Sequence, residues 1–262
     1  SYEEAELARV GAELRLTRCQ TPDEILAAAR EADVILHATH TPIPRRVISA
    51  LAKCKGIVAC NIGTDHIDVA AATERGIIIA NLPDGWTNEV ADHTMALLLA
   101  LNRKVVALNT TFKSGGWHEA KRLIAPLPPL RNMTLGLVGF GHIGRAVARR
   151  ARAFGLKIVA YDPLVEQHIF ASYDVEPMEL ADVLRGSDIV SVHAQLTDRT
   201  RGMIGEEALR MMKPHAILIN TARGPIVDVT ALVRALREGW IAGAALDVFE
   251  REPCPPDNPL LA

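Results

Sequence analysis

The sequence has few aromatic residues, little net charge, few cysteines and no long apolar run. Aromatic side chains make up 4% of the 262 residues, whereas 49% of the residues are hydrophobic, so the core must be mostly aliphatic. The 29 basic and 31 acidic residues give a formal net charge of −2. This balance argues against nucleic acid or an anionic membrane as an obligatory partner, because both bind to strongly basic surfaces.

The cysteines are scattered along the chain at Cys19, Cys54, Cys60 and Cys254. No two of them have C-x-x-C spacing, which predicts neither a metal site nor a redox motif and fits a reducing compartment. The longest apolar run, residues 95–101, is far shorter than the roughly 20 residues of a membrane helix. The start of the chain carries no signal-peptide pattern. We therefore expect a cytoplasmic protein.

Short aliphatic runs alternate with helical patterns along most of the chain. One series of predicted strands covers residues 12–18, 33–39, 56–61 and 76–81. A second series covers residues 134–140, 157–162, 188–193, 216–221 and 242–248. Strand–helix alternation is typical of parallel sheets with helices on both faces. We therefore predict an α/β protein with two doubly wound parallel-sheet domains, at residues 1–82 and 83–262.

The segment between the two series has the pattern of one long helix, at about residues 87–112. Its apolar face is wider than the face needed to cover a small sheet. Such a helix between domains often packs across a subunit interface, which favours a homodimer. An ordinary helix between two domains remains the alternative.

A glycine motif of the form G-x-G-x-x-G joins the predicted strand at 134–140 to a predicted helix. Gly139 permits a tight turn, Gly141 lets the backbone approach a pyrophosphate, and Gly144 lets the helix pack on the strand. The start of the helix then offers N–H groups and a positive dipole to phosphates. The context favours a dinucleotide site over a turn with incidental glycines.

The acidic residue Asp162 ends the next predicted strand. A carboxylate at this position accepts hydrogen bonds from ribose hydroxyls and repels a 2′-phosphate, which favours NAD over NADP. Arg145 and Arg149, which are close in sequence, weaken that preference.

Charged residues follow the last two predicted strands. Arg223 stands at the carboxyl end of a strand, where open α/β sheets bind ligands, and its guanidinium suits a carboxylate or carbonyl group. A surface salt bridge is the alternative role. Asp247, Glu250 and Glu252 follow the next strand and either tune a catalytic histidine or lie in a solvated loop.

Four segments in this order resemble the D-isomer-specific 2-hydroxyacid dehydrogenases: GLVGFGHIGRAVARRARAFGLKIVAYDP, VSVHAQLTDRTRGMIG, INTARGPIVD and AGAALDVFEREP. The upstream stretch NIGTDHIDVAAATERGIIIANLPDGWTNEVADHTMALLLAL is similar to the same family, so the resemblance covers essentially the whole chain. It implies a Rossmann NAD domain and a flavodoxin-like substrate domain. It also implies hydride transfer between NAD and a small D-2-hydroxy or 2-keto acid.

The resemblance implies roles for individual residues. Arg223 would bind the substrate's carboxylate and carbonyl, and Glu252 would pair with a catalytic histidine. The backbone amides around Ile62, Gly63 and Thr64 would hold the substrate carboxylate. The remaining positions would bind the cofactor: Gly139, Gly141, His142, Ile143, Gly144 and Asp162 at the pyrophosphate and ribose, and Val90, His193, Ala194, Thr221, Ala222 and Asp247 along the rest of the molecule, with Asp247 facing the nicotinamide amide.

The chain also departs from the family pattern. The family's catalytic histidine is expected beyond residue 262, and both termini are expected to be truncated. Among internal histidines, we expect His93 to pack within its helix and His66 to cap a turn. Asn61 replaces a common glycine, and Gln195 replaces a common proline.

Two other functions remain open at this stage. The family includes corepressors, so an NAD(H)-binding corepressor-like or sensor protein without efficient turnover is the main alternative to a dehydrogenase. A protein like S-adenosylhomocysteine hydrolase ranks last, because it predicts a different substrate domain and no TARG–EREP pair.

Overall fold

The structure, a computed structural model, describes residues 2–124 and 127–261. The chain forms two compact units, Ser1–Gly85 and Trp86–Ala262. The boundary expected from the sequence, after residue 82, falls in the same turn region that precedes Trp86. Each unit has its own apolar core.

The first unit is built on a small parallel sheet. Its strands, in the order β1-β2-β3, are β1 (Val34–His37), β2 (Gly56–Ala59) and β3 (Ile78–Asn81). Its helices are α1 (Tyr2–Ala8), α2 (Pro22–Ala29), α3 (Arg45–Ala50) and α4 (Val69–Glu74). Side-chain caps explain where α2 and α4 begin: Thr21 accepts from Glu24 N, and Asp68 accepts from Ala71 N.

The strand predicted at residues 12–18 does not form, and this prediction was wrong. Residues 12–20 have no regular structure, and Leu16 is 77% exposed. The alternation of leucine with charged residues imitates a half-buried strand, but a strand also needs a neighbour to complete its backbone hydrogen bonds. The three described strands follow chain order, so the reversal typical of a doubly wound sheet is found in the second unit only.

The second unit is a six-stranded parallel sheet in the order β6-β5-β4-β7-β8-β9. The strands are β4 (Thr134–Val138), β5 (Lys157–Tyr161), β6 (Glu176–Pro177), β7 (Ile189–Val192), β8 (Ile217–Asn220) and β9 (Gly243–Leu246). The positions of β4, β5, β7, β8 and β9 confirm the second predicted series, whereas the two-residue strand β6 was not predicted. The order reverses between β4 and β7, and such a switch point is where doubly wound sheets bind dinucleotides.

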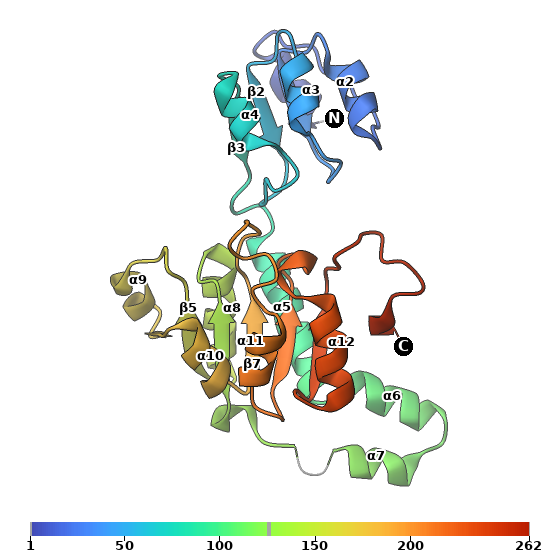
Figure 1. Cartoon of the computed structure of the whole chain (residues 1–262), viewed down its shortest axis with the longest axis vertical. Helices are drawn as coiled ribbons and strands as arrows, with labels where there is room; N and C mark the ends of the chain where they lie inside the picture. The colour runs from blue at the N-terminus through green and yellow to red at the C-terminus, as the bar shows by residue number, and fades with distance from the viewer. Residues whose placement is uncertain (1, 125–126, 262) are drawn as a thin grey trace. The chain divides into compact units, whose positions relative to one another are not determined.

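Helices cover both faces of this sheet (Figure 1). One core contains residues of α5 (Thr87–Asn102), α8 (His142–Ala153) and α9 (Gln167–Ser172). The other contains residues of α10 (Leu180–Gly186), α11 (Glu206–Met211) and α12 (Val229–Glu238). None of the helices in the described parts of the chain is long and apolar enough to cross a membrane.

The single helix predicted at about 87–112 is in fact two helices, so that prediction was wrong. The helix α5 ends at Asn102, and α6 (Val105–Lys113) follows it. Between them Lys104 has φ 55° and ψ 34°, a left-handed conformation that breaks the helical hydrogen-bond ladder. After α6 comes α7 (Trp117–Leu123), and the two project beyond the rest of the unit (Figure 1).

Candidate functional site

The glycine motif forms the tight turn between β4 and α8. Gly139 follows β4 with φ 100°, and its N–H donates to Tyr161 O over 2.8 Å. A side chain on Gly144 would clash with the carbonyl oxygen of Gly139. These two glycines therefore bring the start of α8 directly against the end of β4.

Gly141 is open to a ligand. A Cβ atom on Gly141 would meet no protein atom within 4 Å, and the residue caps α8 without a side-chain hydrogen bond. His142 and Ile143 are the first residues of α8, so their backbone N–H groups lie in its first turn. The open approach and the positive end of the helix fit a pyrophosphate, as the sequence predicts.

Asp162 is held over the glycine turn by backbone amides. One carboxylate oxygen accepts from Phe140 N over 2.8 Å, and the other accepts from Leu164 N over 3.0 Å. A carboxylate oxygen has two lone pairs, so both can also accept ribose hydroxyls. The arginines that follow in α8 lie over Tyr173, with Arg145 at 5.9 Å and Arg149 at 5.7 Å from the ring centroid.

The carboxyl ends of β7 and β8 lie at the same edge of the sheet as the glycine turn after β4. His193 follows β7, and its Nε2 lies 2.9 Å from the hydroxyl of the buried Ser191. Burial lowers the pKa of His193 to about 4, so the imidazole is neutral near pH 7. The backbone of Ala194 lies against Gly139. The structure thus brings these two predicted residues up to the glycine turn.

Thr221 and Ala222 follow β8. Thr221 is buried, and its hydroxyl lies 2.9 Å from that of Thr94 on α5. Ala222 N donates to Asn220 Oδ1 over 3.0 Å, which shapes the turn. Val90, also on α5, accepts the Thr94 hydroxyl at its carbonyl oxygen. These three predicted cofactor residues therefore belong to one hydrogen-bonded region.

Arg223 ends this turn at the carboxyl side of β8. Its Nη1 donates to Ala222 O over 2.8 Å, and its own carbonyl accepts from Asn220 Nδ2 over 2.9 Å. A side chain on Gly224 would clash with the backbone of Phe249, so the Arg223 turn lies against the loop that holds Glu252. Glu252 Oε1 accepts from Phe249 N over 2.9 Å and so closes that loop on itself.

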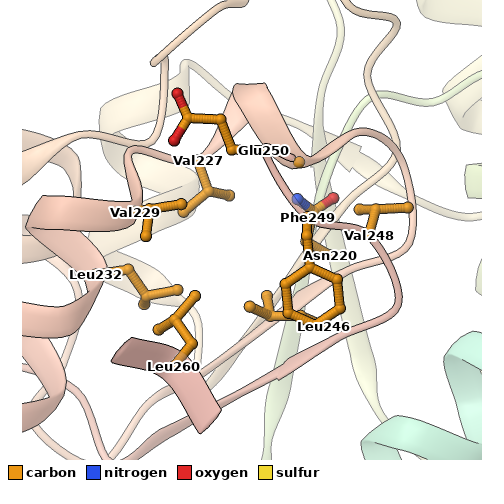
Figure 2. A pocket seen from close by; sticks show the side chains of 10 residues that line it. Asn220, Val227, Val229, Leu232, Leu246, Val248, Phe249, Glu250 and Leu260 are labelled. Atoms are coloured by element: carbon orange, nitrogen blue, oxygen red, sulfur yellow. The ribbon is translucent and has the colours of Figure 1, made fainter. Parts of the chain in front are cut away.

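A small apolar cavity lies behind these two loops (Figure 2). Its volume of about 10 Å³ holds at most one water molecule, so it is no site for a substrate or cofactor. Leu260 closes it opposite the β9 side, and the carboxylate of Glu250 points away from the apolar side chains (Figure 2). The cavity is therefore part of the packing that supports the Arg223 turn.

His93 does not pack within its helix, and this expectation was wrong. Its Nε2 lies 3.2 Å from Asp247 Oδ1, and both side chains are about half exposed. Asp247 directly follows β9, at the same edge of the sheet as the other predicted cofactor residues. Sequence spacing gives no signal for the pair, because its residues are far apart in the chain and meet only when α5 packs on β9.

The predicted substrate loop belongs to the first unit. Ile62, Gly63 and Thr64 are half-buried between β2 and α4. Asn81 Nδ2 donates to Ile62 O over 2.7 Å, and Thr64 O accepts from Ile67 N over 2.9 Å. The loop therefore has a defined shape.

His66 contacts His37, and its expected turn-capping role stays a prediction. Its ring stacks on His37 with centroids 4.9 Å apart, and its Nε2 lies 3.1 Å from His37 Nδ1. Asp68, two residues further on, caps α4. In the described part of the chain, no group of three His, Cys, Asp or Glu side chains is arranged to hold a metal ion.

Comparisons with known proteins agree on one family. Residues 95–262 match the family model for the D-isomer specific 2-hydroxyacid dehydrogenase NAD binding domain. A glyoxylate reductase of Korarchaeum cryptofilum is 44% identical over 95% of this chain and 76% of that protein. A D-3-phosphoglycerate dehydrogenase of Methanocaldococcus jannaschii is 41% identical over 97% of this chain and 48% of that protein.

Solved structures lead to the same family. The crystal structure of D-lactate dehydrogenase from Aquifex aeolicus, complexed with NAD and lactic acid, is 30% identical and has a TM-score of 0.86. The match covers 95% of this chain and 75% of that one. The chain therefore belongs to the D-isomer-specific 2-hydroxyacid dehydrogenases and is an NAD-dependent oxidoreductase that transfers a hydride between nicotinamide and a D-2-hydroxy acid or its 2-keto acid.

Proposed function

We propose that the substrates are short 2-keto acids, with glyoxylate and hydroxypyruvate first among them, reduced at the expense of NADH. The observation that carries this proposal is the position of Arg223. It lies at the carboxyl end of β8, at the same edge of the sheet as the glycine turn. A guanidinium there offers several N–H donors in one plane, which suit both the carboxylate and the carbonyl oxygen of a 2-keto acid. The 44% identity to a glyoxylate reductase supports a small acid.

The substrate's carboxylate is the group that this chain holds. Arg223 donates to the carboxylate and to the oxygen of the reacting carbon. NAD, when bound, supplies or accepts the hydride. Holding the acid group fixes the reacting carbon against the ring and lowers the entropy cost of the reaction.

Proton transfer to the substrate oxygen requires a general acid. Family resemblance assigns this role to a histidine beyond residue 262 and assigns the orientation of that histidine to Glu252. A carboxylate partner fixes the tautomer of an imidazole and raises its pKa. Glu252 Oε1 accepts from Phe249 N, so Glu252 Oε2 is the oxygen that would accept from the histidine.

The activity assay follows NADH absorbance at 340 nm with glyoxylate, hydroxypyruvate, pyruvate and phosphohydroxypyruvate, using the product of the complete gene. We expect Arg223→Ala to abolish turnover while leaving NADH affinity within about twofold. Arg185→Ala, which removes an exposed arginine on α10, is the matched control and should behave as wild type. Turnover that survives in Arg223→Ala would contradict the assignment of Arg223.

The homodimer is also a proposal, and the α6–α7 hairpin supports it. The helix α6 buries none of its side chains. Large apolar side chains are nevertheless exposed along the hairpin: Val105, Val106, Phe112, Trp117 and Ile124, each at least 46% exposed. An apolar surface on a projecting element is typical of a contact with a second copy.

Light scattering tests the dimer. We expect a mass of two chains for the wild type and of one chain for Val106→Asp, because Val106 is 69% exposed and a charge there opposes burial. Val10→Asp, at a residue 78% exposed in the first unit, is the control and should stay dimeric. A monomeric wild type would overturn the proposal.

The corepressor-like alternative has no specific observation in its favour. The relatives and the solved structure named above are enzymes.

The described cysteines, Cys19, Cys54, Cys60 and Cys254, are all unpaired, which is consistent with the cytoplasm as the proposed location.

A further inference from the structure

The strand order tells which part of the edge faces the nicotinamide. Asp162, the ribose ligand, follows β5, and the pyrophosphate turn follows β4. Strands β7, β8 and β9 lie on the opposite side of β4 from β5. A dinucleotide laid across this switch point therefore places its nicotinamide half over the ends of β7, β8 and β9. Asp247 follows the last of these strands.

The helix α5 is fixed in register against this part of the edge. Thr94 donates its only hydroxyl hydrogen to Val90 O over 2.8 Å. The second hydroxyl, on Thr221, must therefore be the donor in the 2.9 Å contact between the two threonines. Both threonines are buried. This bond joins α5 to the end of β8 and determines which residues of α5 reach the neighbouring strand.

His93, the residue before Thr94, reaches Asp247. Its Nε2 lies 3.2 Å from Asp247 Oδ1. The backbone of Asp247 is fixed as well, because its N–H donates to Asn220 O over 3.0 Å. The adjacent acid Asp92 pairs with Arg150 at 2.6 Å, and Asp247 is the carboxylate that pairs with His93.

We propose that His93 is a positioning residue for the cofactor: it holds Asp247 Oδ1 and thereby presents Asp247 Oδ2 to the carboxamide N–H of the nicotinamide. The inference rests on the proposed placement of the cofactor along this edge. A half-exposed aspartate samples several rotamers, and a fixed imidazole partner removes that freedom before the ligand binds. His93 acts through Asp247 and transfers no proton to the substrate.

The experiment compares two ligands that share every part except the nicotinamide end. NADH and ADP-ribose are titrated into the chain by calorimetry, and the emission of bound NADH is recorded. In His93→Leu we expect NADH to bind about tenfold more weakly, the size of one hydrogen bond to a charged group, while ADP-ribose affinity stays within about twofold. The enhancement of NADH emission should fall in parallel, because the ring is less well held.

Two further variants separate positioning from general structure. His93→Gln keeps a donor at a similar reach and should recover most of the NADH affinity. His215→Leu removes another histidine–aspartate pair, in which His215 Nε2 lies 2.8 Å from Asp188 Oδ1. His215 precedes β8, so this pair lies at the opposite edge of the same sheet. This control should leave both affinities unchanged.

The outcomes are distinguishable. Equal weakening of NADH and ADP-ribose in His93→Leu, or no weakening of either, would overturn the positioning role. Failure of His93→Gln to recover NADH affinity would also overturn it. Wild-type protein that binds neither ligand would instead refute the proposed placement of the cofactor along this edge.

Discussion

Gly139 lies so close to Ala194 that a Cβ atom on the glycine would stand 2.5 Å from the Ala194 backbone nitrogen. The end of β4 and the end of β7 therefore touch through their backbones at the point where the sheet order reverses. Gly139 also has φ 100°, which an alanine adopts only with strain. We expect Gly139→Ala to lower the free energy of unfolding by about 2 kcal/mol or more, measured by urea denaturation.

A substitution at Gly141, in the same turn, should weaken cofactor binding with little effect on stability. A methyl group there meets no protein atom within 4 Å, and φ is −73°, so Gly141→Ala should change the unfolding free energy by less than about 1 kcal/mol. The methyl group would occupy the space where the pyrophosphate approaches the backbone. We expect NADH affinity to fall at least about tenfold. Unchanged NADH affinity in Gly141→Ala would contradict the placement of the pyrophosphate.

The Thr94–Thr221 bond makes a prediction about stability that depends on which partner is removed. Thr94→Val leaves the buried Thr221 hydroxyl without its acceptor and should cost about 1–3 kcal/mol. Thr221→Val leaves Thr94 still bonded to Val90 O and should cost less. Urea denaturation of both variants and of the double variant measures this difference. Equal costs for the two single variants would contradict the assigned direction of the bond.

The fold of the second unit follows closely from its sequence. Each aliphatic run of the second series forms a strand, because the runs are short and bounded by turn residues, and the glycine motif joins β4 to α8 as predicted. The break at Lys104 has no comparable signal, since neither glycine nor proline marks the left-handed residue. Residues 12–18 show the opposite error. Their alternating pattern predicts a strand, but they pair with none of the described strands.

The sequence predicts the position of those site residues that directly follow a strand. Asp162, His193, Thr221 and Asp247 all stand just after a parallel strand, and such positions meet at one edge of a sheet. His93 was misjudged because its role depends on how α5 is fixed against β8 and β9. That register comes from a buried bond between two threonines distant in sequence, which no local pattern encodes.

Burial of His193 predicts a loss of stability in mild acid. Its pKa is about 4 in the folded chain, against an ordinary value of 6.5, so the unfolded chain binds the proton more readily between these two values. Stability is therefore fully present above pH 6.5 and falls as the pH drops toward 4, by up to about 3 kcal/mol from this residue.

The matched variant is His193→Asn, which does not titrate in this range. Its unfolding free energy, measured in urea at several pH values, should fall less steeply than that of the wild type between pH 6.5 and pH 4. Parallel curves for the two proteins would contradict a lowered pKa of His193 in the folded chain.

Asp162 should control the choice between NADH and NADPH. Its carboxylate is fixed by two backbone amides and repels a 2′-phosphate. Asp162→Asn keeps an oxygen acceptor and removes the charge, so we expect NADPH to bind about tenfold more tightly and NADH somewhat more weakly. Fluorescence titrations with the two cofactors measure the ratio. A ratio that does not move would mean that another group discriminates against the 2′-phosphate.

The most direct test of the central claim is the oxidation of paired enantiomers. The product of the complete gene is incubated with NAD and either D-glycerate or L-glycerate, and then with D-lactate or L-lactate, and NADH formation is followed at 340 nm. NADH formed from a D enantiomer alone is the result that a D-isomer-specific dehydrogenase requires. NADH formed equally from both enantiomers, or from the L form alone, would contradict the account.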